Sequence, residues 1–213
     1  MKNVRVFYKK TDRLKFVSHL DMNRFMTRAV RRTAIPVWYT EGFNCHAYIT
    51  FALPLSLGFE SEYEVMDFKV TDDDYPLDEI ERQLRAVMPE YIEIIKADIP
   101  EMKSGKIAYA AFSVFFDEIS EKLTEDIKAF LSSPKILCTK KNKKGIEAEI
   151  DISPKIKSWE INSQELKLIL AAGNDNLNPT LLLSALEGYI GGALPSYGIT
   201  RTALFDGELN LFR

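Results

Sequence analysis

The sequence predicts an α+β protein made of two tandem ferredoxin-like halves. Its composition is that of an ordinary globular protein, with 46% hydrophobic and 28% charged residues among 213. Along the chain, apolar residues switch between the strand period of two and the helical period of about 3.6. The resulting order of elements is β-α-β-β-α-β, the ferredoxin-like pattern, which occurs in residues 1–100 and again in residues 105–213.

The first half begins with a strand in which Val4, Val6 and Tyr8 alternate with charged or aromatic neighbours. Ser18, followed three residues later by Asp21, has the form of a helix N-cap. The expected elements of this half are a strand over 4–9, a helix over about 19–33, strands over 47–53 and 63–70, a helix that opens at Pro76 and Leu77 and stops before Pro89, and a strand over 91–95. Prolines follow both helices and end them.

The second half repeats this order. Its second helix starts with Asn178 as N-cap and Pro179 at the first position, and it ends near Gly191. The expected elements are a strand over 107–116, a helix over 123–131, strands over 136–139, 146–152 and 166–171, the helix from 179, and a strand over 199–205. The stretch 155–161 is extra to the pattern. The lysine-rich segment 140–145 is typical of a solvated β-turn, with an auxiliary phosphate contact as the alternative.

Several classes of protein are excluded by simple features. The apolar runs are shorter than the roughly 20 residues that span a bilayer, and Met1 is followed by a strand pattern rather than an apolar signal segment. Cys45 and Cys138 form neither a disulfide framework nor a CxxC pair. We therefore expect a soluble, cytoplasmic protein. Phosphate-binding GxxxxGK[ST], GxGxxG, nucleophile-elbow, HExxH and CxxxCxxC motifs are all absent from the sequence, so we expect no cofactor in this chain.

The net charge of −3 conceals a basic N-terminal segment. Residues 1–33 carry ten bases against two acids, which gives +8, and the remaining residues carry the compensating −11. The bases are Lys2, Arg5, Lys9, Lys10, Arg13, Lys15, Arg24, Arg28, Arg31 and Arg32. A basic end on an otherwise acidic chain indicates a localised anion-binding surface.

The expected first helix carries an arginine face. Arg24, Arg28, Arg31 and Arg32 stand at i, i+4, i+7 and i+8, so they share one side, while apolar residues occupy the other. Guanidiniums without interleaved acids repel one another unless an anion neutralises them. Three interpretations stay open: a solvated face paired with strand carboxylates, a site for RNA or another polyanion, and a protein interface. Lys9, Lys10, Arg13 and Lys15 would extend the anion-binding surface.

Aromatic residues gather just after this helix. Trp38, Tyr39 and Phe43 surround a turn formed by Gly42 and Asn44. Aromatic side chains beside a basic helix are what base stacking requires, but a small domain also uses them to seal the edge of its core.

His19 and His46 are the two histidines of the chain and are candidates for acid–base catalysis. With Asp21 and Cys45 they also suggest a metal site, but none of the usual zinc spacings is present, so we expect no metal. Asp21 is better explained as a carboxylate favoured by the helix dipole.

Glu64 precedes the apolar positions of an expected strand and shares their face. A carboxylate buried there needs a partner. We expect that partner to be an arginine of the first helix, in a structural role.

Several of these segments together resemble a known family. The motifs are Phe16–Asp21, Arg28–Arg32, Gly42–Asn44, Pro54–Gly58, and Glu60-Ser61 with Glu64 and Asp67. In this order and spacing they are similar to the bacterial radical-SAM-linked proteins, a family of unknown function encoded beside or fused to a B12-binding-type radical SAM protein. One position departs from the pattern, since Cys45 stands where the family usually has proline.

The resemblance implies a radical SAM protein as partner, and the family's gene neighbourhood suggests RNA as the substrate class. The leading hypothesis is a non-catalytic accessory protein that binds RNA or a nucleotide-bearing substrate for a radical SAM enzyme. The arginine face would hold phosphates, and the three aromatic residues would stack on bases. The alternatives are a metal-independent RNA-processing enzyme that uses His19 or His46, and an adaptor that binds only protein.

Overall fold

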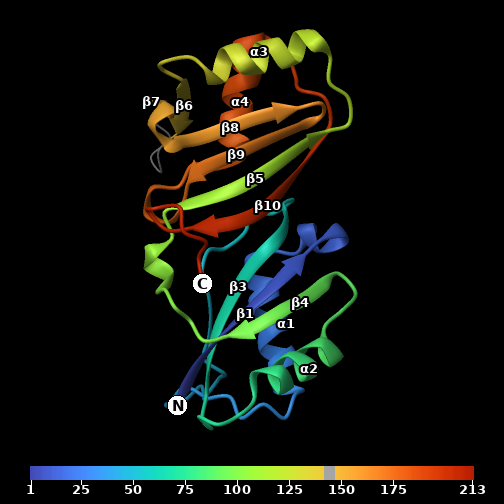
Figure 1. Cartoon of the computed structure of the whole chain (residues 1–213), viewed down its shortest axis with the longest axis vertical. Coiled ribbons are helices and arrows are strands. Elements are labelled where there is room, and N and C mark those ends of the chain that lie inside the picture. Colours follow the sequence, from blue (N-terminus) through green and yellow to red (C-terminus); the bar gives the residue numbers. More distant parts are fainter. Residues whose placement is uncertain (142–146) are drawn as a thin grey trace. The chain divides into compact units, whose positions relative to one another are not determined.

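The computed structural model describes residues 1–141 and 147–213 and has mixed α+β secondary structure (Figure 1). The chain divides into two compact units, one of residues 1–107 with 212–213 and the other of residues 108–211. The turn predicted within segment 140–145 lies largely outside the described residues. In the described part of the chain, no helix is long and apolar enough to cross a membrane.

The first unit follows the predicted element order. Its elements are β1 (Lys2–Lys10), the short 3-10 helix η1 (Asp12–Phe16), α1 (His19–Arg31), β2 (Ile49–Phe51), β3 (Glu60–Val70), α2 (Leu77–Val87), β4 (Ile92–Asp98) and the 3-10 turn η2 (Ser104–Lys106). β1 lies between β4 and β3, β2 pairs with β3, and all three pairings are antiparallel.

Alternation along the strands of this unit divides its sheet into two faces. Val4, Val6 and Tyr8 of β1 are buried in one core with the apolar residues of both helices, including Met26 of α1 and Leu84 of α2. The residues between them therefore point to the face of the sheet that the helices do not cover. Arg5, Asp67 and Thr50 are directly paired neighbours across β1, β3 and β2, so all three belong to this helix-free face.

The second unit contains β5 (Tyr109–Phe116), α3 (Glu121–Leu131), β6 (Leu137–Lys141), β7 (Glu147–Asp151), η3 (Ser153–Lys155), β8 (Ile156–Asn162), β9 (Glu165–Ala171), η4 (Gly173–Asp175), α4 (Pro179–Ile190) and β10 (Tyr197–Phe205). Its sheet has the order β10-β5-β9-β8. Asn178 caps α4 as predicted, and Gly191 ends the helix with φ +68°.

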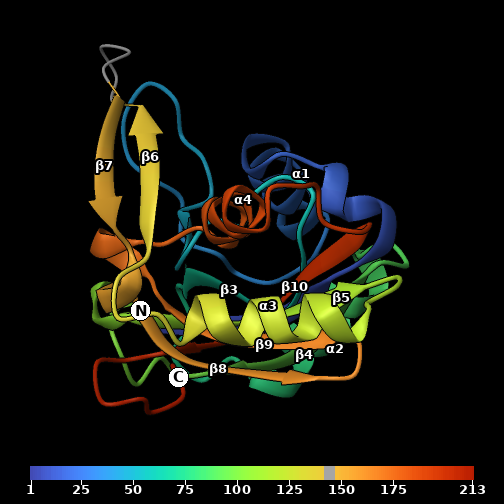
Figure 2. The same cartoon turned by 90° about the horizontal axis from the view of Figure 1, so that it is seen from above.

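One part of the second unit differs from the sequence prediction. The extra stretch 155–161 is β8, a strand of the sheet, whereas β6 and β7 form a separate two-stranded hairpin. Figure 2 shows this hairpin standing apart from the strands of the sheet. The pattern was misleading because β8 lies at an edge and its ladder shifts register between Ile156 and Ser158, which breaks the apolar alternation.

Candidate functional site

The helix α1 separates its basic and apolar residues onto two faces. Ser18 is the N-cap, and its hydroxyl oxygen accepts the backbone N–H of Asp21 at 3.2 Å. The buried positions are Met22, Met26, Ala29 and Val30. The exposed positions include all four arginines, Arg24, Arg28, Arg31 and Arg32. The helix therefore presents a basic face on the surface of the first unit.

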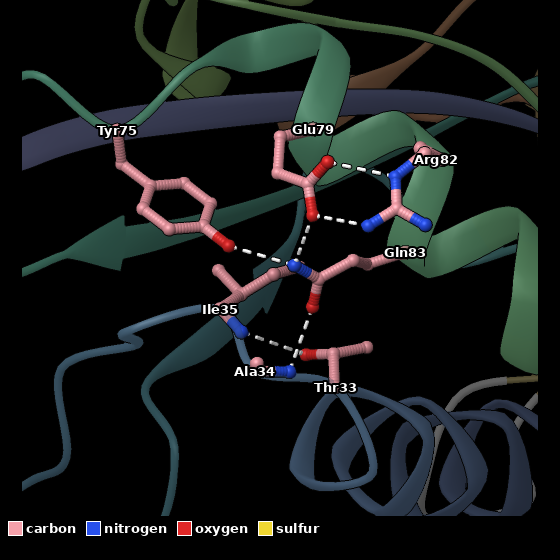
Figure 3. A network of polar contacts seen from close by, with 7 residues as sticks. All are labelled: Thr33, Ala34, Ile35, Tyr75, Glu79, Arg82 and Gln83. Atoms are coloured by element: carbon pink, nitrogen blue, oxygen red, sulfur yellow. Dashed lines mark hydrogen bonds and ion pairs between the residues drawn. The ribbon is translucent and has the colours of Figure 1, made fainter.

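The C-terminal end of α1, where Arg31 and Arg32 lie, is tied to α2 by a polar network (Figure 3). The Gln83 carboxamide oxygen accepts the backbone N–H of Ala34 at 2.7 Å, and its nitrogen donates to Tyr75 at 2.7 Å and to Glu79 at 2.6 Å. Arg82 binds the Glu79 carboxylate through two nitrogens. These hydrogen bonds from Arg82 and Gln83 lower the pKa of Glu79 to about 2, so the network stays charged near neutral pH.

Among the residues that the structure describes, most of the arginine face has no carboxylate partner. Arg24 donates to Asp21 at 3.2 Å, in an exposed pair. Arg28, Arg31 and Arg32 have no carboxylate within ion-pair distance among the described residues. The pairing with strand carboxylates considered from the sequence is thus not seen for these three. Their positive charge is left to solvent or to a binding partner.

The four bases considered as extensions of this surface have different surroundings. Lys9 pairs with Glu93 at 3.0 Å and Lys15 with Glu60 at 3.3 Å, so both charges are partly neutralised. Arg13 is exposed. Lys10 is only 3% exposed, and its ammonium donates to the carbonyl of Val17 at 3.0 Å.

Lys10 is therefore an interior residue and cannot hold a phosphate at the surface. The sequence indicates this position, because Lys10 is an even-numbered residue of β1, like the buried residues Val4, Val6 and Tyr8, and alternate residues of a strand face the same side.

The aromatic segment forms a short extension of the sheet. Val37 bridges to Val70 of β3, and Tyr39 bridges to Ala47, so residues 37–48 fold back on themselves. The tip of this segment holds Gly42, with φ +119°, and Phe43, whose ring is fully exposed.

Trp38 and Tyr39 are neighbours on an extended chain and contact different groups. The Tyr39 ring lies 5.8 Å from the guanidinium of Arg31 on α1. Trp38 instead packs edge-on against Tyr48, with ring centroids 5.6 Å apart, and under the ammonium of Lys69 at 5.3 Å. The three aromatic residues therefore do not share one stacking surface. Tyr39 is the one placed beside the arginine face.

The two histidines are both exposed but have different partners. The His19 ring packs edge-on against Phe51, with centroids 5.3 Å apart. The Nδ1 atom of His46 lies 3.0 Å from the Asn44 carbonyl and 3.1 Å from the Thr40 hydroxyl. A carbonyl only accepts, so Nδ1 is the donor in its contact with Asn44. Within the described residues, no group of three or more His, Cys, Asp or Glu side chains is arranged to hold a metal ion.

Buried charge in the first unit is held by a residue pair that the sequence interpretation missed. Glu64 is buried, at 5% exposure, as its strand position predicts. The expected pairing of Glu64 with an arginine of α1 stays a prediction. A different ion pair is formed by Arg5 of β1, which binds Asp67 of β3. Its Nε and Nη2 donate to the two oxygens of Asp67 at 2.8 and 2.7 Å. The signal in the sequence was the odd parity of Arg5, which places it opposite the core-facing residues of β1.

Comparison with known proteins decides which family the chain represents. A family described as uncharacterized proteins conserved in bacteria (DUF2344) matches residues 3–179, well over half of the sequence. The chain belongs to this family. The match to DUF2344 includes the whole arginine face, the aromatic segment and the Arg5–Asp67 pair. No curated protein matches the chain significantly.

Among solved structures, a chain in the crystal structure of a Cbf5-Nop10-Gar1 complex is similar to this DUF2344 protein. The identity is 12% and the TM-score is 0.44, and the alignment covers 94% of this chain. It covers 48% of the other chain, so this protein spans about half the length of the structure that it matches.

Proposed function

We propose that this protein is a non-catalytic, cytoplasmic accessory protein that binds RNA, or a substrate bearing nucleotides, through the arginine face of α1. The observation that carries the proposal is the exposure of Arg28, Arg31 and Arg32 without an ion-pair partner among the described residues. Phosphates that bind to such a face reduce the repulsion between its guanidinium groups.

The dimensions of the face suit a nucleic-acid strand. Arg24 and Arg32 are eight residues apart, which is about 12 Å along a helix axis. That length corresponds to roughly three to four nucleotides of a stacked strand. Tyr39, beside Arg31, supplies a ring on which one base can stack at the end of the face.

The second part of the proposal is that the partner protein is a radical SAM enzyme. Its support is the resemblance of the motifs from Phe16 to Asp67 to the radical-SAM-linked proteins. Radical chemistry and its cofactors would belong to that partner, and this chain would present the substrate. Co-purification of such an enzyme with the tagged full chain, before and after nuclease treatment, separates bridging by RNA from direct contact between the two proteins.

We also infer that each unit is a ferredoxin-like domain. In the first unit, the strand order β4-β1-β3 with β2 on β3 is the order expected for a β-α-β-β-α-β chain folded into one antiparallel sheet. In the second unit, β10-β5-β9-β8 follows the same order, with the hairpin β6-β7 as an insertion before β8.

The test of RNA binding compares two variants that lose the same charge. In the first, the four arginines of α1 are changed to Gln. In the control, four exposed lysines of the second unit are changed to Gln: Lys122, Lys128, Lys135 and Lys157. Bulk tRNA at low salt should bind the native protein and the control variant, with at least tenfold weaker binding to the arginine variant. Equal affinities for both variants would show that the arginine face is not the RNA site.

A further inference from the structure

The helix-free face of the first unit contains a cavity of about 450 Å³, on the side of the sheet opposite α1. Its floor is made of paired residues on adjacent strands. Arg5, Asp67 and Thr50 form one row, and Asn3 and Lys69 form the next. Residues 100–104 line it as well, and the backbone N–H groups of Glu101 and Met102 donate to the carbonyl of Arg213. The volume is within the range of small-molecule sites, roughly 300–1,000 Å³.

The cavity contains an arginine whose hydrogen bonding is incomplete. Arg5 is 1% exposed, and Asp67 fixes its guanidinium through Nε and Nη2. The third nitrogen, Nη1, is buried and has no hydrogen-bond partner among the described residues. The ring of Phe212 covers the guanidinium, with 4.3 Å from Cζ to the ring centroid. A buried charged donor without a partner is unusual in a folded protein and calls for an explanation, such as a bound group or a water molecule.

The charges at the cavity favour an anionic ligand. Arg5 and Asp67 neutralise each other. Lys69 and Lys103 have no carboxylate within ion-pair distance among the described residues, and Glu101 is the remaining acid of the lining. The net charge of the lining is therefore positive by one. A phosphate monoester bound by the two ammonium groups compensates this excess.

The wall of the cavity also offers an aromatic surface. Tyr48 lines the cavity and is 41% exposed, and its ring is held by Trp38 at 5.6 Å. Lys69 lies over both rings, at 5.3 Å from Trp38 and 5.8 Å from Tyr48, so its ammonium is fixed beside the aromatic surface. A planar ring stacked on Tyr48 would place a phosphate attached to it within reach of Lys69.

We propose that this cavity binds a single nucleotide, with its phosphate at Lys69 and Lys103 and its base against Tyr48. The nucleotide is either a free mononucleotide or one residue of an RNA strand. The site is distinct from the arginine face, because its residues lie on the sheet face opposite α1. The experiment for this site therefore measures binding that does not involve the four arginines of the arginine face.

The experiment is calorimetric titration of the full chain with adenosine 5′-monophosphate, and with inorganic phosphate and adenosine as the two half-ligands. The variant is Lys69→Gln, at a half-buried position that tolerates the change, with circular dichroism to verify folding. The matched control is Lys106→Gln, an exposed lysine next to the cavity loop that does not line the cavity.

We expect adenosine monophosphate to bind more tightly than either half-ligand and Lys69→Gln to weaken it at least tenfold, while Lys106→Gln leaves it unchanged. A short single-stranded RNA that binds more tightly than the mononucleotide, with the same dependence on Lys69, identifies the strand as the source. Tighter binding of the mononucleotide identifies the free form.

Three results would overturn the proposal: no heat of binding for adenosine monophosphate at millimolar concentration, equal effects of the two lysine variants, or equal affinities for phosphate and the nucleotide. The four-arginine variant keeps this cavity. The proposal of RNA binding at the arginine face and the proposal of nucleotide binding in the cavity can therefore be refuted separately.

Discussion

Removing the Asp67 carboxylate should destabilise the first unit strongly, because it leaves Arg5 charged and buried. Arg5 is 1% exposed, so water cannot replace the two hydrogen bonds that its guanidinium loses. Asp67→Ala is the appropriate change, because it removes the acceptors and leaves the arginine in place.

The size of the effect follows from the geometry. Two charge-assisted hydrogen bonds of about 1.5–3 kcal/mol each set the upper range. Loss of one partner of a buried ion pair costs about 3–5 kcal/mol. The reverse change, Arg5→Met, should cost less, about 1–2 kcal/mol, because the side chain of Asp67 is 21% exposed and water can solvate its carboxylate. In a double-mutant cycle, the two single variants should therefore lose unequal amounts of stability, with the larger loss for Asp67→Ala.

The assay is urea unfolding followed by tryptophan fluorescence. The chain has two tryptophans, Trp38 in the first unit and Trp159 in the second, so a Trp159→Phe background reports on the first unit alone. With an m-value of about 1–3 kcal/mol/M, the midpoint for Asp67→Ala should fall by at least about 1 M. A loss below about 1 kcal/mol, or an equal loss for Arg5→Met, would show that Asp67 does not compensate a buried charge on Arg5.

Three further predictions concern other groups of the first unit. Burial raises the pKa of Tyr63 to about 12. The folded state therefore holds the phenolic proton more tightly than the unfolded state does. The stability that this contributes is complete below pH 10 and is lost as pH rises from about 10 to 12. Tyr63→Phe should flatten that part of the pH–stability curve, and an unchanged curve would contradict the assignment. The hydrogen bond from the Ser18 hydroxyl is the main cause that lowers the pKa of Asp21. Ser18→Ala should therefore raise the pKa of Asp21 towards its usual range, as followed by NMR, and should cost about 1 kcal/mol of stability because the N-cap of α1 is lost. The control Ser120→Ala, at the N-cap of α3, should leave the pKa of Asp21 unchanged. Labelled structured RNA incubated with the protein and a chelator should stay intact, and cleavage that is abolished by His19→Ala or His46→Ala would instead favour the RNA-processing enzyme.

Local signals predicted the parts of the structure that depend on neighbouring residues in the chain. Ser18 and Asn178 cap their helices because a side-chain oxygen satisfies a free backbone N–H, a requirement that is visible in the sequence. The two faces of α1 follow from helical periodicity alone. The mixed α+β class follows from the order of periodic segments.

The remaining features depend on contacts between distant segments. The pairing of Arg5 with Asp67 joins residues 62 positions apart, and periodicity does not report register. Lys10 lies in the interior, not with the surface bases, because its strand position faces the core and the Val17 carbonyl accepts from its ammonium. β8 was missed because an edge strand tolerates polar residues on both faces. The cavity at Lys69 arises from three strands and a loop, which no single sequence window contains.

The most direct test of the account is the salt dependence of RNA binding by the native protein and by the four-arginine variant. Each phosphate contact contributes about 0.7 to the slope of log affinity against log salt for a single strand. We expect a steep slope for the native protein that falls by roughly two to three units when all four arginines become Gln. No binding at low salt, or the same slope for both proteins, would show that the arginine face of α1 does not contact phosphates.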